Sequence, residues 1–196
     1  QLFYYLFFYI RLAWGKVNIN ENVNEPVSII ICAREEAENL EKFLPLILEQ
    51  DYPNFEVIVV NDCSEDHTED VLKNFKKKYS NLRYTTIKKD EKFTHGKKLA
   101  QTIGIKSAIN EKLIFTDADC YPVSNQWIKN ISGSFQSKTE IMLAYGGYEK
   151  APGLLNKFIR YDSFFIALQY LTFARAGIPY MGIGRNLSYL KSLFFK

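Results

Sequence analysis

Short apolar runs alternate along the chain with longer stretches in which apolar residues recur every three or four positions. The short runs have the length of strands, and residues 27–32 are typical of a strand buried on both faces of a sheet. The recurring pattern describes one apolar face of a helix, and Pro45 should kink the first of these helices or leave one carbonyl unpaired. The predicted strands are residues 27–32, 55–60, 82–87, 113–116 and 141–148, and the predicted helices lie near residues 40–48, 68–79, 97–109, 127–135 and 154–175.

This alternation predicts an α/β fold with a mostly parallel central sheet and helices on both faces, as in Rossmann-like nucleotide-binding folds. In such sheets, ligands bind beyond the carboxyl ends of the strands. Polar residues that directly follow a predicted strand are therefore the first candidates for a binding site.

Length and composition narrow the class of protein. The chain has 196 residues, enough for one substantial core, and a net charge of +3 that gives no support to nucleic-acid binding. Its three cysteines are widely spaced and odd in number, which fits neither a disulfide framework nor a zinc site. We therefore expect a reduced, cytoplasmic setting for the domain.

The two ends of the chain predict a fragment of a longer, membrane-associated protein. Residues 2–14 are apolar apart from Arg11, with Lys16 following, and this stretch would extend about 20 Å as a helix, less than a bilayer core. The whole segment 1–17 is considered together. It is interpreted as the end of a membrane anchor or as an amphipathic helix, and its basic residues favour a cytoplasmic side for the domain after it. Residues 18–26 resemble a linker, and residues 27–196 are expected to form the main domain. Because the chain stops inside an apolar run, we expect this domain to be incomplete at its C-terminus.

Asp117 and Asp119 follow the predicted strand 113–116 and flank a single residue. We expect no His or Cys near them in the fold, so the two carboxylates predict an oxygen-only site for Mg²⁺ or Mn²⁺, completed by phosphate oxygens and water. The alternative is structural, with one of the two aspartates capping the next helix.

Two further groups follow predicted strands. Asp62 comes directly after the second strand and is suited to accept hydrogen bonds from a ribose hydroxyl or a base N–H, although it equally suits an Asx-turn. Gly96, Lys97 and Lys98 open a predicted helix, whose N-terminal N–H groups and lysine would suit a diphosphate. A lysine pair at a helix start is, however, often only solvated. The run Arg34-Glu35-Glu36 follows the first predicted strand and is the last candidate for the binding site.

Several other kinds of site are not indicated. The chain lacks a P-loop, a Gly-x-Gly-x-x-Gly after its first strand and a Gly-x-Ser-x-Gly elbow. His67 and His95 are interpreted as structural or surface residues, and Asp66 or Ser64 as the cap of the helix 68–79. The aromatic residues between Phe158 and Phe173 could line an acceptor groove, but their spacing is more typical of a core.

With these motifs in order, the chain resembles the family 2 glycosyltransferases with a GT-A fold, from about Pro26 to Tyr189. The resemblance rests on five stretches, which are 27–40, 50–68, 96–104, the Asp-x-Asp motif at 116–119, and Gly182-Ile-Gly-Arg-Asn-Leu-Ser-Tyr189. At Glu35 this chain departs from the family, which commonly has Asn there.

The resemblance implies a role for each matching residue. It places Ala33, Arg34, Glu36 and Asp62 at the nucleotide, Lys97 at the diphosphate, Asp117 at the ribose and the metal, and Asp119 at the metal, with Gly184 and Asn186 on the acceptor side. The implied activity is metal-dependent inverting transfer from a nucleotide-diphosphate sugar, with UDP as the family-level expectation, to a lipid or polysaccharide acceptor. The implied catalytic base is a downstream aspartate beyond Lys196.

Two competing functions remain open from the sequence. A sugar-1-phosphate nucleotidyltransferase also combines an α/β fold with metal-binding acids, but it usually has a glycine-rich loop after its first strand, where this chain has none. A non-catalytic nucleotide-sugar-binding module would keep the same crevice without transferring sugar.

Overall fold

The computed structural model describes residues 1–15, 19–20, 24–88, 96–136 and 138–196. The chain forms two compact units, one made of residues 1–18 and 143–186 and the other of residues 19–142 and 187–196. We call the first the helical unit and the second the sheet unit. Among the described residues, no helix is both long enough and apolar enough to cross a membrane.

The sheet unit is built on six strands in the order β3-β2-β1-β4-β6-β5. Neighbours among β3, β2, β1 and β4 pair in parallel, and β6 pairs antiparallel with β4. The strands are β1 (Val27–Ala33), β2 (Phe55–Asp62), β3 (Leu82–Ile87), β4 (Lys112–Asp117), β5 (Ile141–Leu143) and β6 (Leu187–Leu190). The predicted α/β class and the mostly parallel sheet are confirmed.

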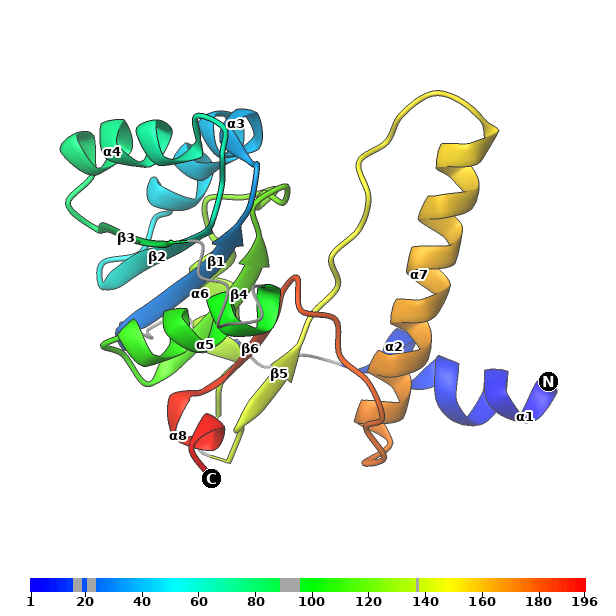
Figure 1. Cartoon of the computed structure of the whole chain (residues 1–196). Coiled ribbons are helices and arrows are strands. Elements are labelled where there is room, and N and C mark those ends of the chain that lie inside the picture. The colour runs from blue at the N-terminus through cyan, green and yellow to red at the C-terminus, as the bar shows by residue number, and fades with distance from the viewer. Residues whose placement is uncertain (16–18, 21–23, 89–95, 137) are drawn as a thin grey trace. The chain divides into compact units, whose positions relative to one another are not determined.

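Helices cover both faces of this sheet, as the sequence predicts (Figure 1). Alternate residues of β1 point to opposite faces, so that Ile29 and Ile31 pack under α3, α4 and α6 while Ile30 packs under α5. The helices are α3 (Ala37–Leu48), α4 (Thr68–Lys78), α5 (Lys97–Ser107), α6 (Trp127–Ser134) and the short α8 (Lys191–Phe194). Pro45 lies inside α3, which continues to Leu48.

The helical unit consists mainly of an N-terminal helix and the long helix α7 (Leu154–Arg175). The N-terminal helix comprises α1 (Leu2–Tyr4), a π-helical segment η1 (Tyr5–Tyr9) and α2 (Ile10–Trp14). It contacts α7 through stacked rings of Phe8 and Phe173, with centroids 4.4 Å apart. Tyr170 is the largest fully buried side chain of the unit, and its hydroxyl donates to the carbonyl of Ala144.

The structure differs from the predicted elements in three places. The predicted strand 141–148 is reduced to the three residues of β5, because the glycine pair 146–147 continues as irregular backbone. The antiparallel strand β6 was not predicted. The aromatic stretch of α7 is buried at Tyr170, but Phe158, Tyr161 and Phe164 are exposed, so the core interpretation is wrong for these three residues.

A buried polar cluster fixes the sheet at the amino ends of its strands. Glu56, the second residue of β2, is 8% exposed and accepts from the Ser28 hydroxyl at 2.6 Å, the Ile109 N–H at 2.8 Å and the Arg83 guanidinium at 2.7 Å. Ser28 belongs to β1 and Arg83 to β3. One carboxylate therefore joins three adjacent strands to the turn that precedes β4.

Replacing Glu56 with Ala should lower the free energy of unfolding by roughly 2–4 kcal/mol, because it leaves the buried Ser28 hydroxyl and the partly buried Ile109 N–H without their acceptor. Chemical denaturation monitored by circular dichroism measures this change. The control is Glu69→Ala on α4, which removes an exposed ion pair with Lys73 and should leave the free energy of unfolding nearly unchanged, because water and salt screen such a pair. Equal losses in the two variants would show that the cluster does not stabilise the sheet.

Candidate functional site

A pocket of about 350 Å³ opens at the carboxyl ends of β1, β2 and β4. The parallel register explains its position, since Ala33 of β1 pairs with Asn61 of β2 and Cys32 pairs with Asp117 of β4. The three strands therefore end at the same level, and the residues that follow them enter one space. The pocket is lined by Cys32, Ala33, Arg34, Glu36, Asp62, Gly96, Lys97, Ala100, Asp117, Ala118 and Asp119.

The loops after β1 and β2 are joined by a ladder of hydrogen bonds. The N–H of Glu35 donates to the Ser64 hydroxyl at 3.0 Å, and the Glu35 carboxylate accepts from the N–H of Glu65 at 2.7 Å. The next two N–H groups, of residues 36 and 37, donate to the side chains of Thr68 and Asp66. The two loops therefore hold each other in place on one side of the pocket.

Glu35 adopts a left-handed backbone conformation with φ of +55°. Non-glycine residues rarely adopt this conformation, and Asn is among those that tolerate it best. The reciprocal bonds to Ser64 and Glu65 compensate for the conformational cost of Glu35 at this position.

Asp66 connects the starts of two helices. Its carboxylate accepts from the Thr68 N–H at 3.0 Å at the start of α4 and from the Ala37 N–H at 3.2 Å at the start of α3. The N-cap position of α4 is His67, so the prediction of Asp66 or Ser64 as the N-cap is wrong. Partial burial raises the pKa of Asp66, whereas these hydrogen bonds to its carboxylate lower it by more. The pKa of Asp66 therefore lies below its usual value.

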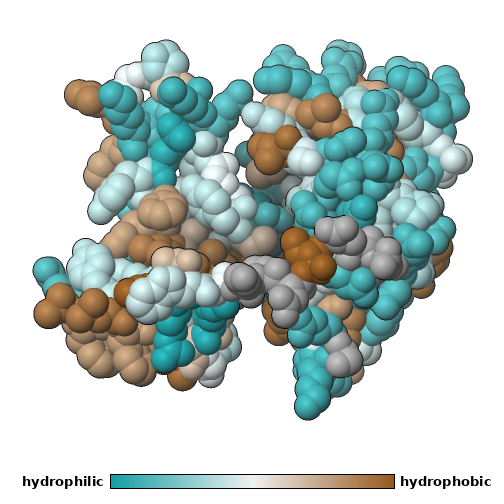
Figure 2. Space-filling model, turned by 180° about the vertical axis from the view of Figure 1, so that it is seen from behind, coloured by the Kyte–Doolittle hydropathy of each residue, from teal (hydrophilic) through white to brown (hydrophobic). Residues whose placement is uncertain are grey.

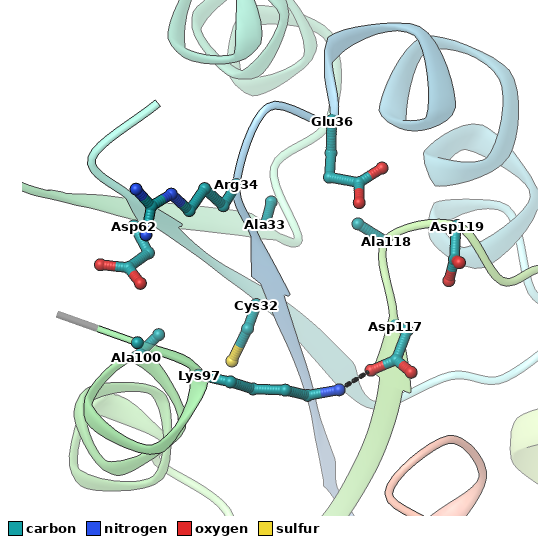
Figure 3. A pocket seen from close by; sticks show the side chains of 11 residues that line it. Cys32, Ala33, Arg34, Glu36, Asp62, Lys97, Ala100, Asp117, Ala118 and Asp119 are labelled. Carbon is teal, nitrogen blue, oxygen red and sulfur yellow. Dashed lines mark hydrogen bonds and ion pairs between the residues drawn. The ribbon is translucent and has the colours of Figure 1, made fainter. Parts of the chain in front are cut away.

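Asp62 and Asp119 lie on opposite sides of the pocket (Figure 3). Asp62 ends β2 and is only 3% exposed, whereas Asp119 is exposed in the turn after β4. Arg34 extends toward the Asp62 side and Glu36 toward Ala118. A ligand that spans the pocket would meet a buried carboxylate and an arginine at one end and an accessible carboxylate pair at the other.

Lys97 crosses the floor of the pocket from the first turn of α5. Its ammonium group donates to the Asp117 carboxylate at 2.5 Å (Figure 3). Helix α5 lies close to the sheet because Gly104 has no side chain, and a Cβ there would lie 2.6 Å from a methyl group of Ile30. The first N–H groups of this helix lack intrahelical partners and can bind an anion near Lys97.

A third potential metal ligand accompanies the predicted carboxylate pair. The ligand atoms of Asp117, Asp119 and Cys120 all lie within 4.8 Å of one another, and the Cys120 thiol donates to the Asp119 carboxylate at 3.4 Å. The expectation that no cysteine lies near the carboxylate pair is therefore wrong, and the oxygen-only metal site stays a prediction. The two carboxylates suit Mg²⁺ or Mn²⁺, whereas a thiol ligand suits softer ions such as Zn²⁺.

Sequence reasoning missed Cys32 as a pocket residue because it used the cysteines only to infer the redox setting. Strand alternation was the available signal, since Cys32 lies two residues after Ile30 and so points to the α5 face. Burial raises the pKa of the Cys32 thiol to about 12, with Lys97 lowering it in part and Asp117 and Asp62 raising it. The thiol is therefore neutral at physiological pH.

The remaining sequence candidates lie elsewhere. Gly184 and Asn186 belong to the helical unit and are not among the residues that line the pocket. Asn186 has a left-handed backbone with φ of +68°, and its side chain donates to the Tyr145 carbonyl at 2.9 Å. His67 is exposed, as expected of a surface residue, and His95 lies outside the described residues.

Residues 28–194 match the model of the family described as glycosyl transferase family 2. The chain is 36% identical over 141 residues to the glycosyltransferase AglE of Haloferax volcanii, which covers 70% of this chain and 44% of that protein. It is 32% identical over 138 residues to a Methanococcus voltae protein named as a dolichyl N-acetyl-α-D-glucosaminyl phosphate diacetamido-dideoxyglucuronosyltransferase, covering 67% and 39% respectively. The chain thus spans less than half the length of these two relatives.

Solved structures share the fold. The mannosyltransferase PcManGT from Pyrobaculum calidifontis, in complex with GDP-Man and Mn²⁺, aligns with a TM-score of 0.73 at 20% identity over 99% of this chain and 52% of its own. TarS of Staphylococcus aureus in complex with UDP-GlcNAc aligns with a TM-score of 0.54 at 24% identity, over 65% and 37% of the two chains. The likeness confirms the GT-A fold that the sequence implied.

The raised pKa of Cys32 predicts slow alkylation in the folded protein. At pH 8 its thiolate fraction should be roughly a thousandfold below that of an ordinary cysteine, and its reaction with iodoacetamide should accelerate as the pH approaches 12. Peptide mass spectrometry after timed alkylation measures the rate at each cysteine. The control is the same chain unfolded in urea, and equal rates at Cys32 in the folded and unfolded chains would contradict the assignment.

Proposed function

The chain belongs to glycosyl transferase family 2, and from this membership we propose that its pocket binds a nucleotide-diphosphate sugar for transfer of the sugar to an acceptor hydroxyl. The proposal rests on one observation, which is that the parallel strands β1, β2 and β4 end side by side at the same edge of the sheet. This arrangement brings the buried carboxylate of Asp62, a lysine at a helix start, and the carboxylates of the half-buried Asp117 and the exposed Asp119 into one pocket. These groups match the base and ribose, the diphosphate and the metal of such a donor, in that order.

The nucleoside is proposed to bind at the β1–β2 side. Asp62 is buried and oriented by the end of its strand, so its carboxylate can accept from a base N–H or a ribose hydroxyl with little competition from water. Ala33, Arg34 and Glu36 complete this side of the pocket. The family-level expectation for the base is uracil, giving UDP-sugar as the donor.

The diphosphate is proposed to bind against α5. Lys97 already lies in the pocket, paired with one carboxylate oxygen of Asp117. An incoming phosphate oxygen can take over its ammonium donor while the N–H groups of the first helical turn bind the same anion. Lys97 would then neutralise part of the charge that develops on the departing nucleoside diphosphate.

The metal is proposed to bind at Asp119, with Asp117 shared between the metal and the ribose. A bound Mg²⁺ or Mn²⁺ would supply positive charge against the leaving diphosphate. Asp119 suits this role because its carboxylate is accessible in the pocket, and Asp117 can turn its second oxygen outward while the first remains near Lys97.

Inversion at the anomeric carbon requires a base that removes the acceptor proton from the opposite face. We propose that this base lies outside the chain, which the greater length of the relatives supports, so that the chain alone transfers sugar poorly. The acceptor would be a lipid or polysaccharide bound on the side of Gly184 and Asn186. A cytoplasmic, membrane-associated location is part of the same proposal.

A non-catalytic nucleotide-sugar-binding module is the second candidate, because the same pocket would serve it. Metal-dependent release of sugar by a longer form of the protein would distinguish an enzyme from such a module. Incorporation of nucleotide from a nucleoside triphosphate would instead identify a nucleotidyltransferase.

Replacing Lys97 with Met should weaken UDP binding roughly tenfold, because it removes a charge-assisted hydrogen bond to the diphosphate. Isothermal titration calorimetry with UDP and Mn²⁺ measures the affinity. Lys98→Met is a matched control, since Lys98 is the next residue of the same helical turn, is exposed and does not line the pocket. If both variants bind UDP equally weakly, Lys97 acts only through the general positive potential and the diphosphate assignment fails.

Removing the metal should weaken UDP binding in the same assay. EDTA should reduce the affinity of the wild-type chain, and Asp119→Asn should bind UDP with equal affinity in Mn²⁺ and in EDTA. Asp70→Asn changes an exposed aspartate on α4 and should keep the full metal dependence. Metal-dependent binding that survives in Asp119→Asn would place the metal elsewhere.

A further inference from the structure

Helix α7 exposes an apolar stripe on its first three turns. Leu154, Phe158, Tyr161 and Phe165 recur at intervals of four, three and four residues, so they lie along one side of the helix. The first three leave 82%, 67% and 63% of their surface exposed, and Phe165 is half-buried with its ring stacked on Tyr161. Three of the four buried residues of the helix, Ser163, Ala167 and Tyr170, lie on the opposite side, and the fourth, Thr172, lies in its last turn.

The N-terminal helix of the same unit also exposes apolar side chains. Leu2, Phe3, Leu6 and Phe7 are 48–72% exposed, and apolar surface gathers over this helix in the lower left of Figure 2. The helical unit holds 16 of the 30 aromatic residues of the chain in 62 of its 196 residues. Eleven of these 16 aromatic side chains are exposed, which is unusual for a surface that only meets water.

The charge of the helical unit is strongly positive. Its seven basic residues and two acidic residues, Glu149 and Asp162, give it a net charge of +5. The whole chain carries +3, so the remainder carries −2. On α7 itself, Lys157 flanks one edge of the stripe and Asp162 the other, whereas Arg160 lies closer to the buried side of the helix. The apolar surface therefore belongs to the part of the chain that is attracted to anions.

We propose that the stripe of Leu154, Phe158 and Tyr161 docks into the surface of a lipid bilayer that contains acidic phospholipids. Aromatic and apolar side chains fit the boundary between headgroups and acyl chains, and flanking lysine and arginine side chains fit the headgroup phosphates. Lys157 lies beside the stripe, so a helix that lies along the surface places this charge among the headgroups. The other basic residues of the helical unit add to its general attraction to an anionic surface. Docking of this kind does not require the chain to transfer sugar, and it adds a second contact to the N-terminal segment.

The positive net charge of the helical unit favours an acidic membrane, rather than another protein surface, as the partner that covers the stripe. Each basic residue near an anionic leaflet adds to binding, and the contribution falls as salt screens it. We therefore expect binding of the chain to a bilayer to depend on both the lipid headgroup and the ionic strength.

Co-sedimentation of the 196-residue chain with vesicles tests the proposal. Binding should be strong with vesicles of phosphatidylcholine and phosphatidylglycerol, at least tenfold weaker with phosphatidylcholine alone, and reduced by salt. The triple variant Leu154→Ser, Phe158→Ser, Tyr161→Ser should lose at least tenfold in affinity for the acidic vesicles. The control Ile109→Ser, Val123→Ser removes two exposed apolar residues of the sheet unit and should bind as the wild type does.

Three results would overturn the proposal. The first is that the folded wild type does not bind acidic vesicles. The second is that the triple variant binds them as tightly as the wild type, which would assign any membrane contact to the N-terminal helix. The third is a wild-type dimer that the triple variant dissociates, which would make a second copy the occupant. Circular dichroism and UDP titration of each variant keep loss of folding, and failure of the proposed donor site, distinct from loss of lipid binding.

Discussion

Parallel pairing of β1 with β2 on one side and β4 on the other is the constraint on which the pocket depends. The register places Ala33 beside Asn61 and Cys32 beside Asp117, so the chain leaves all three strands at the same level. At the other end of the strands, the buried Glu56 carboxylate holds β1, β2 and β3 together. A slip of one residue would turn the buried side chains of a strand to the opposite face and separate the pocket groups.

Much of this arrangement could be predicted because the sequence signals are local. β-branched runs identify buried parallel strands, and apolar residues at helical spacing identify the helices between them. Parallel topology then requires that polar residues after the strands meet at one edge. These signals are enough to expect Asp62, Lys97, Asp117 and Asp119 in one place, and the structure brings them to the same pocket.

The features that could not be predicted depend on contacts between distant residues. The four residues of β6 have no strand signal of their own and become a strand by pairing with β4. The bonds from Glu35 to Ser64 and Glu65 join loops about thirty positions apart, and nothing in either loop indicates the other. Periodicity in α7 identifies its apolar stripe but says nothing about what covers it, so Phe158 and Tyr161 were assigned to a core from which they are excluded.

The central claim is that one pocket binds the nucleoside at Asp62, the diphosphate at Lys97 and the metal at Asp119. A crystal structure of the chain with UDP and Mn²⁺, measured at the manganese absorption edge, tests all three assignments at once. We expect an anomalous peak coordinated by Asp119, phosphate oxygens within hydrogen-bonding distance of Lys97, and the uridine beside Asp62. Manganese away from Asp119, or a uridine bound on the Asp119 side with the phosphates at Asp62, would contradict the claim.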